Sequence, residues 1–137
     1  MAQAPLPNGS GGYQLGDGNV GEARLIAQGA PTAITGTTAT LTGAQMAAGL
    51  ITSNTSGDTV VTLPTVADLE LAISSAQKAN VAFDFAVAVD DASYQCTLAT
   101  ADGWTLLGNM VVLENSGALF RARKTGAGAW TLYRIAG

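Results

Sequence analysis

The stretch Asn80-Val81-Ala82-Phe83-Asp84-Phe85-Ala86-Val87-Ala88-Val89-Asp90 decides the fold class. Large apolar residues occupy every second position from 81 to 89, and alanine or aspartate occupies the positions between them. Side chains along a β-strand point alternately to opposite faces, so this period of two predicts a strand with one buried face. Its opposite face is predicted to carry only small or charged side chains.

Further short segments rich in threonine, aliphatic and aromatic residues lie on both sides of this strand. Turn residues separate them, as in Asp102-Gly103 and Asn115-Ser116-Gly117, and we interpret these turns as hairpin connections. Many short strands separated by turns are typical of a β-sandwich or barrel. The additional strands are predicted at residues 23–28, 32–42 with a break at Gly36, 50–53, 58–63, 94–99, 104–107, 110–113, 119–124 and 129–135.

Two short helices are predicted between these strands. Thr42 precedes the segment Gly43-Ala44-Gln45-Met46-Ala47-Ala48 as an N-cap, and Gly49 follows it as a helix stop. Thr65 caps a longer segment, residues 66–76, whose apolar positions recur at helical spacing. Acidic residues in the first turns of this second segment suit the positive end of a helix dipole.

Residues 1–22 differ in composition from the rest of the chain. The run Pro7-Asn8-Gly9-Ser10-Gly11-Gly12 holds almost nothing to bury, and glycine loses the most backbone entropy when it is ordered. We therefore expect residues 1–22 to form a flexible N-terminal arm and residues 23–137 to form the β-domain. The arm has neither the charged start nor the apolar run of a signal peptide, so none is expected.

The composition excludes several classes of function. The chain has no histidine, one cysteine and only 12% charged residues, with a formal net charge of −4. Histidine-based catalysis and histidine or thiolate metal sites are therefore excluded within one chain. A negative net charge does not suit nucleic acid, which is bound through clustered lysine and arginine. No apolar run reaches the length of a membrane span, so we expect no membrane as a partner. From the composition and the charge we likewise expect no cofactor and no nucleic acid.

Three motifs suggest chemistry but have simpler interpretations. Residues 16–21 match the GxGxxG dinucleotide pattern, yet they follow no predicted strand and open no predicted helix. Asp90-Asp91 resembles a pair of catalytic carboxylates, but neighbouring residues on a strand face opposite ways, which favours a hydrated acidic turn. Cys96 lies in the middle of a predicted strand and is expected to be a buried, unreactive thiol.

The aromatic residues Trp104, Trp130 and Tyr133 leave two interpretations open. Together they could form a platform on which a sugar ring stacks. Packing in the core or between subunits is favoured, because each residue lies within a strand pattern.

The predicted core contains few large side chains and much alanine and threonine, which bury little apolar surface each. We expect association of identical subunits, most simply in a cyclic homo-oligomer, to supply the missing stability.

Five segments follow one another in a fixed order along residues 37–137. They are the helical turn before Gly49-Leu50-Ile51, the step Thr62-Leu63-Pro64, the strand Phe83-Asp84-Phe85, and the terminal segments Phe120-Arg121-Ala122-Arg123-Lys124-Thr125-Gly126 and Trp130-Thr131-Leu132-Tyr133-Arg134. This order resembles a β-module that recurs in virion proteins of tailed bacteriophages, particularly the head decoration (capsid cement) proteins. The shared motifs are packing and turn motifs.

The resemblance implies a mainly β, jelly-roll-like sandwich or barrel that forms a homotrimer on the outer capsid surface of the virion, after synthesis in the host cytoplasm. It implies the major capsid protein as partner, and neither catalytic residues nor a cofactor. From the residues of the arm itself we infer that it binds the capsid. The residues expected to do so are Tyr13, Leu15, Asp17, Val20, Glu22, Arg24 and Leu25.

Two other functions stay open. The same module at the tip of a phage tail fibre or needle would bind a host receptor or glycan, although the chain shows none of the long shaft segments usual in fibre proteins. A small enzyme acting through Asp90 or Asp91 is the least favoured alternative.

Overall fold

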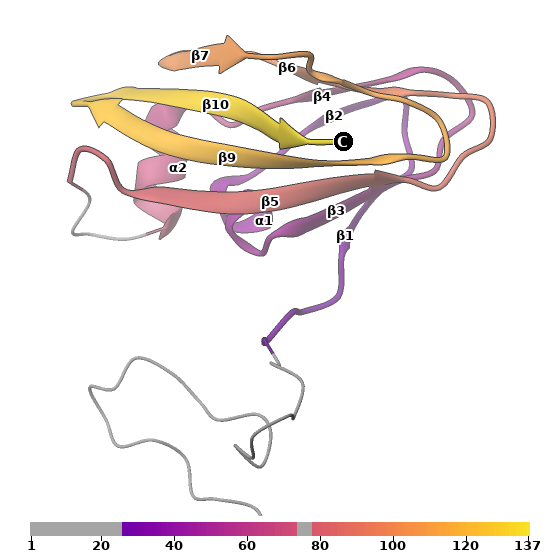
Figure 1. The fold of residues 1–137 in the computed structure, drawn as a ribbon, viewed down its shortest axis with the longest axis horizontal. Coiled ribbons are helices and arrows are strands. Elements are labelled where there is room, and N and C mark those ends of the chain that lie inside the picture. The colour runs from indigo at the N-terminus through magenta and orange to yellow at the C-terminus, as the bar shows by residue number, and fades with distance from the viewer. Residues whose placement is uncertain (1–25, 74–77) are drawn as a thin grey trace, which may run out of the picture.

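The structure is a computed structural model, and it describes residues 26–73 and 78–137. This part of the chain holds ten strands and two helices (Figure 1). Residues 26–31 have exposed side chains and lead away from the strands. The elements are β1 (Thr32–Ile34), β2 (Thr38–Thr40), α1 (Gly43–Ala47), β3 (Leu50–Ser53), β4 (Thr59–Thr62), α2 (Val66–Ile73), β5 (Ala82–Val89), β6 (Cys96–Ala99), β7 (Trp104–Leu107), β8 (Val111–Val112), β9 (Gly117–Gly126) and β10 (Ala129–Ala136).

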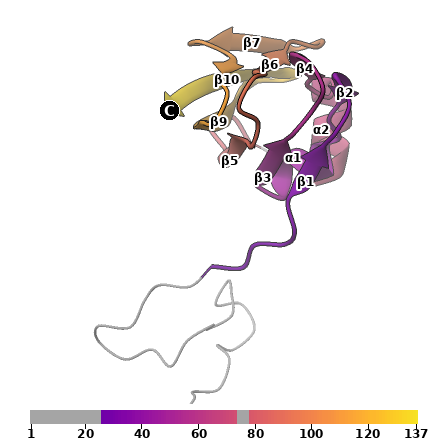
Figure 2. The same ribbon diagram turned by 90° about the vertical axis from the view of Figure 1, so that its right-hand side faces the viewer.

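The strands form two sheets that enclose one core (Figure 2). The six-stranded sheet has the order β1-β3-β5-β9-β10-β7, and the four-stranded sheet has the order β2-β4-β6-β8. Each connection from β1 to β9 therefore passes from one sheet to the other. Within the described residues, β9 and β10 are the one pair of consecutive strands that share a ladder, and the turn at Ala127-Gly128 joins them.

The first six strands wind as a coil in which one turn repeats. In the six-stranded sheet β1, β3 and β5 run parallel, and in the four-stranded sheet β2, β4 and β6 do the same. The helices lie on the return connections, α1 between β2 and β3 and α2 between β4 and β5. Parallel neighbours require such crossover connections, because a tight turn can only reverse the chain.

The two helices begin in the same way. The hydroxyl of Thr42 accepts a hydrogen bond from the Gln45 amide at 3.1 Å, and that of Thr65 accepts one from the Asp68 amide at 3.2 Å. Each cap follows a buried leucine that leaves its strand. Gly43 opens α1 where the helices touch, since a Cβ there would lie 2.7 Å from the Cβ of Ala72. A small residue at this position lets α1 and α2 pack closely.

Aromatic side chains fill the centre between the sheets. Phe85 of β5 stacks on Phe120 of β9 with ring centroids 5.5 Å apart. Trp130 of β10 lies beside Trp104 of β7 at 6.2 Å and meets Phe83 edge-on at 6.0 Å. Aromatic pairs at these separations contribute beyond the apolar area that they bury.

Much of the predicted secondary structure is confirmed. Residues 82–89 form β5, and from Phe83 onward its large apolar side chains face the core. The helix after Thr42 and the helix after Thr65 are both present. The structure describes the second helix as far as Ile73, so its predicted end at residue 76 lies outside the described residues. The mainly β fold with two short helices and two facing sheets is thus as expected.

Three expectations need correction or are unconfirmed. Residues 26–28 are not a strand, and residues 32–42 hold two short strands in different sheets. The turns at Asp102-Gly103 and Asn115-Ser116-Gly117 do not close hairpins, because each leads into the opposite sheet. A jelly-roll connectivity is not confirmed: it pairs strands antiparallel, whereas five of the eight pairings among the described strands are parallel.

The predicted division at residue 22 stays a prediction. Residues 1–25, which contain the arm, lie outside the described residues.

Two leucines of α2 provide a test of the core. Leu69 is fully buried, whereas Leu71 is 87% exposed. We expect Leu69→Ala to lower the free energy of unfolding by about 2–5 kcal/mol, because it removes apolar contacts and leaves a cavity. Leu71→Ala, the same change on the same helix, should cost less than about 0.5 kcal/mol. Urea unfolding of the two variants measures the difference, and equal losses would contradict this packing of α2.

Candidate interaction face

The side of the six-stranded sheet that is turned away from the core forms an outer face with side chains in cross-strand rows. Strand register places four residues opposite one another on successive strands of the sheet: Leu50 of β3, Ala86 of β5, Leu119 of β9 and Ala136 of β10. We call these four residues the apolar row. Three of them are half-buried by their neighbours and Ala136 is exposed.

A second row runs beside the apolar row. It consists of Ala33 of β1, Thr52 of β3, Ala88 of β5 and Gly117 of β9, which are register neighbours in the same way. We call it the small-residue row. None of its side chains is larger than that of threonine, so the backbone of the sheet lies close to the surface here.

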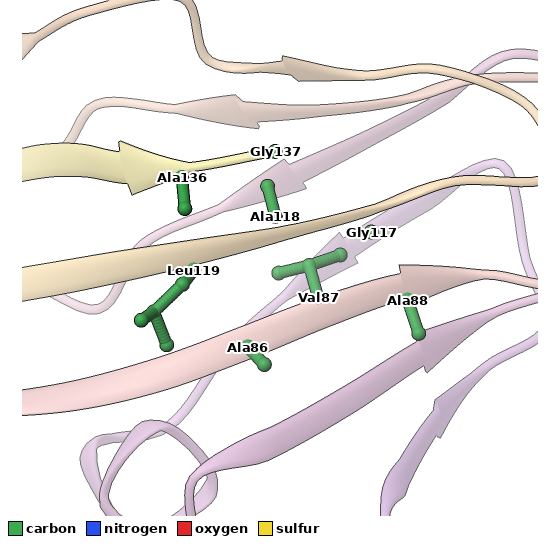
Figure 3. Close-up of a pocket in the computed structure, with 8 residues that line it drawn as sticks. All are labelled: Ala86, Val87, Ala88, Gly117, Ala118, Leu119, Ala136 and Gly137. Carbon is green, nitrogen blue, oxygen red and sulfur yellow. The ribbon is translucent and has the colours of Figure 1, made fainter.

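Members of both rows from β5, β9 and β10 line a shallow hollow of about 300 Å³ (Figure 3). Its lining comes from β5, from β9, from the last residue of β10 and from Gly137, which follows β10. Val87 and Ala118 line it while their side chains are buried in the core. The other lining residues are Ala86, Ala88, Gly117, Leu119, Ala136 and Gly137. No residue with a polar side chain contributes to this lining.

A third row carries charges that are already paired. Arg121 of β9 donates two hydrogen bonds to Asp84 of β5, from Nε to Oδ1 at 2.6 Å and from Nη2 to Oδ2 at 2.9 Å. These bonds hold the pKa of the Asp84 carboxyl below its usual value. Tyr133 and Leu107 continue this charged row across β10 and β7.

Arg123 extends the polar part of the face. Its guanidinium donates to the Tyr133 hydroxyl at 2.8 Å and to Asn80 Oδ1 at 3.0 Å. One half of the outer face is therefore small and apolar, and the other half is polar with its hydrogen bonds made within the chain.

A second hollow, of about 410 Å³, lies at the start of α2. Glu70 and Asp102 are its acidic lining residues. The Glu70 carboxylate is engaged: Oε1 accepts a hydrogen bond from Trp130 Nε1 at 3.0 Å and lies 3.3 Å from Lys124 Nζ. The bond from Trp130, aided by Lys124, lowers the pKa of Glu70. This arrangement fastens α2 to the hairpin of β9 and β10.

The residues predicted to bind the capsid all lie outside the described residues. They are Tyr13, Leu15, Asp17, Val20, Glu22, Arg24 and Leu25. The GxGxxG-like segment at residues 16–21 lies there as well.

The simpler interpretations of Asp90-Asp91 and Cys96 are confirmed. Asp91 Oδ1 accepts hydrogen bonds from the amides of Ser93 and Tyr94, so this carboxylate shapes the turn after β5. Asp90 is exposed. Cys96 is fully buried, and burial raises the pKa of its thiol above the usual value, which keeps it protonated and unreactive.

The aromatic residues do not form a surface platform. Trp104 is 9% exposed and Trp130 is 1% exposed, and both belong to the core. Trp104 Nε1 donates to the carbonyl of Pro64 at 2.7 Å. Tyr133 is half-buried and its hydroxyl accepts the bond from Arg123. Core packing, the favoured interpretation of the two tryptophans, is confirmed.

The sequence predicts the small and charged residues on one side of β5, but it does not predict the cross-strand rows that they form with the neighbouring strands. Ala82, Asp84, Ala86 and Ala88 are the intervening residues of that strand. Their small or charged nature was noted, but register alone shows which of them meet Leu119, Gly117 and Arg121.

Comparison with protein-family models, with curated proteins and with solved structures finds no match for this chain. Among the residues that the structure describes, no three histidine, cysteine or acidic side chains are grouped as a metal site would need. In the same residues no helix is long and apolar enough to cross a membrane.

Substitution of Glu70 tests the link between α2 and the hairpin. Glu70→Ala leaves the buried indole N–H of Trp130 without its acceptor, which should lower the free energy of unfolding by about 1–3 kcal/mol. Glu70→Gln keeps an oxygen for Trp130 and removes the charge beside Lys124, so we expect a loss below about 1 kcal/mol. Chemical denaturation at pH 7 ranks the two variants, and the reverse order would contradict the assigned hydrogen bond.

The pH dependence of the same site has a definite sign. The folded-state pKa of Glu70 is lowered, so its ionised form stabilises the fold above the unfolded-state pKa of about 4.3. This stabilisation is lost as the pH falls through the lower folded-state value. The stability advantage of the wild type over Glu70→Gln should therefore be present at pH 7 and vanish in acid. An advantage that grows in acid would contradict the lowered pKa.

Proposed function

We propose that this chain is a virion structural protein, a capsid decoration or cement protein that binds the outside of a phage head as a homotrimer. The resemblance of its motif order to head decoration proteins supports the proposal. The observation that carries it is the outer face of the six-stranded sheet. That face offers short side chains and internally paired charges, which suit contact with another protein surface.

In this proposal the N-terminal arm binds the capsid. Residues 26–31 have exposed side chains and lead away from the strands (Figure 1), and in this proposal the arm precedes them. Apolar residues in a glycine-rich strip can dock on the capsid with little side-chain bulk around them. Three arms tethered to one trimer bind at a high effective concentration, so contacts that are individually weak hold firmly together.

Binding across neighbouring capsomers gives the trimer its effect on the capsid. Each trimer that bridges two capsomers adds contacts that must break before they separate. The packaged genome pushes outward on the shell, and such bridges oppose that load. The major capsid protein is the partner in this account, and neither nucleic acid nor membrane takes part.

Deletion of residues 2–22 tests the role of the arm. We expect the shortened chain to keep its circular dichroism spectrum and its oligomeric mass, because the described core lies after residue 25. It should fail to co-sediment with heads purified without this protein, whereas the full chain should co-sediment. Retained binding by the shortened chain would contradict the arm's role.

The number of copies in each virion separates decoration from the tail-tip alternative. We expect hundreds of copies on the capsid, measured by quantitative mass spectrometry of purified particles. A handful of copies, placed at the tail by cryo-electron microscopy, would reject decoration in favour of a receptor-binding tip.

A further inference from the structure

We propose that copies of this chain bind one another head to tail, through an acidic end on one copy and a basic patch on the next. The inference rests on the homo-oligomer of the proposed function, and it does not depend on binding to heads. It identifies the two surfaces through which the copies meet and the attraction between opposite charges that arranges them.

The acidic end lies where three connections meet at one end of the molecule (Figure 1). They are the connections β3–β4, β5–β6 and β8–β9, and none of them contains a lysine or an arginine. Within the described residues, ion pairs are made by Asp84 and Glu70 and by none of the carboxylates of these connections. These carboxylates, which we call the acidic end, are Asp58, Asp90, Asp91 and Glu114.

Hydrogen bonds between the connections hold the acidic end together. The amide of Gln95 donates to Asp58 Oδ1 at 3.2 Å, which joins β5–β6 to β3–β4. The amide of Asn115 donates to the carbonyl of Asp91 at 2.8 Å, which joins β8–β9 to β5–β6. Asp91 is half-buried, and the other carboxylates of the acidic end are exposed. Like charges gathered in this way repel one another, and a cation from another copy would relieve that repulsion.

The basic patch lies toward the opposite end, where β5 begins and β9 ends on the outer face (Figure 1). We define it by its cations, Lys78, Arg121 and Arg123. Asp84 balances the charge of Arg121, but the guanidinium of Arg123 is held by a hydroxyl and by an amide oxygen, which are both neutral. Lys78 is exposed before β5 and makes no ion pair with the described residues. The patch therefore keeps an excess of positive charge.

Opposite charges on two parts of one molecule favour a second copy as the partner. Two acidic ends repel each other, and so do two basic patches, whereas an acidic end attracts a patch. The two hydrogen bonds of Arg123 hold its guanidinium in position, so less side-chain entropy is lost when a carboxylate binds it. Complementary charges fix the relative orientation of partners and disfavour other arrangements.

Exposed apolar side chains lie beside the charges on both surfaces. Tyr94, 38% exposed, and Leu113, 54% exposed, belong to the connections of the acidic end. Leu107, 50% exposed, is the register neighbour of Tyr133, whose hydroxyl binds Arg123. Contact between these side chains adds burial of apolar surface to the attraction between charges. Aromatic residues and arginine are enriched in protein interfaces.

The contact joins two different surfaces, so each copy can use both at once. Such a head-to-tail contact forms a closed ring when the rotation between copies closes, and a filament when it does not. The basic patch lies on the side of the six-stranded sheet, so each copy is turned relative to the one before it. A ring needs such a turn, and a ring of three copies is the homotrimer of the proposed function.

Two variants with reversed charges test the contact. Lys78→Glu with Arg123→Glu reverses the basic patch, and Asp90→Lys with Glu114→Lys reverses the acidic end. We expect the natural chain to sediment as an oligomer and each variant alone to sediment at the 13.8 kDa mass of one chain. An equal mixture of the two variants should sediment as a complex, because the natural acidic end of the first meets the natural patch of the second. Two variants that had failed to fold could not restore each other.

Asp68→Lys is the matched control for the charge reversals. It makes the same change at an exposed aspartate of α2, which belongs to neither surface. This variant should keep the oligomeric mass of the natural chain. Circular dichroism verifies that every variant is folded.

Salt provides an independent measurement on the natural chain. Between about 0.1 M and about 1 M sodium chloride, the screening length falls from about 10 Å to about 3 Å. We expect the dissociation constant of the oligomer to rise at least about tenfold over this range. An interface that depended on apolar burial alone would not weaken.

These measurements use the chain without heads, so they judge this inference separately from the capsid role. A chain that stays monomeric at every concentration overturns the inference, as does an oligomer that survives both reversals. A mixture that does not reassemble, or an association that salt leaves unchanged, overturns it as well. A chain that associates through these surfaces yet never binds heads keeps the inference and rejects the capsid role.

Discussion

The structure depends on one constraint, the alternation of strands between two sheets. From β1 to β8 each strand has its ladder partners in segments that come before or after an excursion to the opposite sheet. Neither sheet can form from one local stretch of chain, so both must form together around the shared core. The stacking of Phe85 on Phe120 joins β5 to β9 at its centre, where the parallel coil meets the terminal hairpin. Non-local pairing of this kind makes folding slow and cooperative.

The buried polar contacts serve the same constraint. The indole of Trp130 donates to Glu70 of α2, and that of Trp104 donates to the carbonyl of Pro64 just before α2. Both tryptophans bring large apolar surface into the core and direct their one polar atom to the crossover segment, which is the connection from β4 to β5 that contains α2. The crossover is therefore held against β7 and β10, strands that lie far from it in the sequence. A buried donor without such a partner would cost free energy.

The outer face follows from the same strand that organises the core. The large residues of β5 fill the interior, so its intervening residues must face outward, and they are alanine and aspartate. Pairing with β9 then sets Asp84 beside Arg121 and Ala86 beside Leu119. The face acquires a polar half that is satisfied within the chain and an apolar half that is not covered in the described residues. The core and the outer face are thus the two sides of one alternating pattern.

The sequence by itself determined the local features: the alternation along β5, the threonine caps of both helices, and burial of Cys96. These depend on the period of the side chains and on hydrogen bonds within a few residues, which a sequence displays directly. Only the tertiary structure decided which strands pair. A turn such as Asp102-Gly103 could close a hairpin or could lead the chain into the opposite sheet, and its residues are the same in both cases. Partners for Glu70 and the rows of the outer face were hidden for the same reason. Register across a sheet joins residues tens of positions apart, and no local pattern encodes that distance.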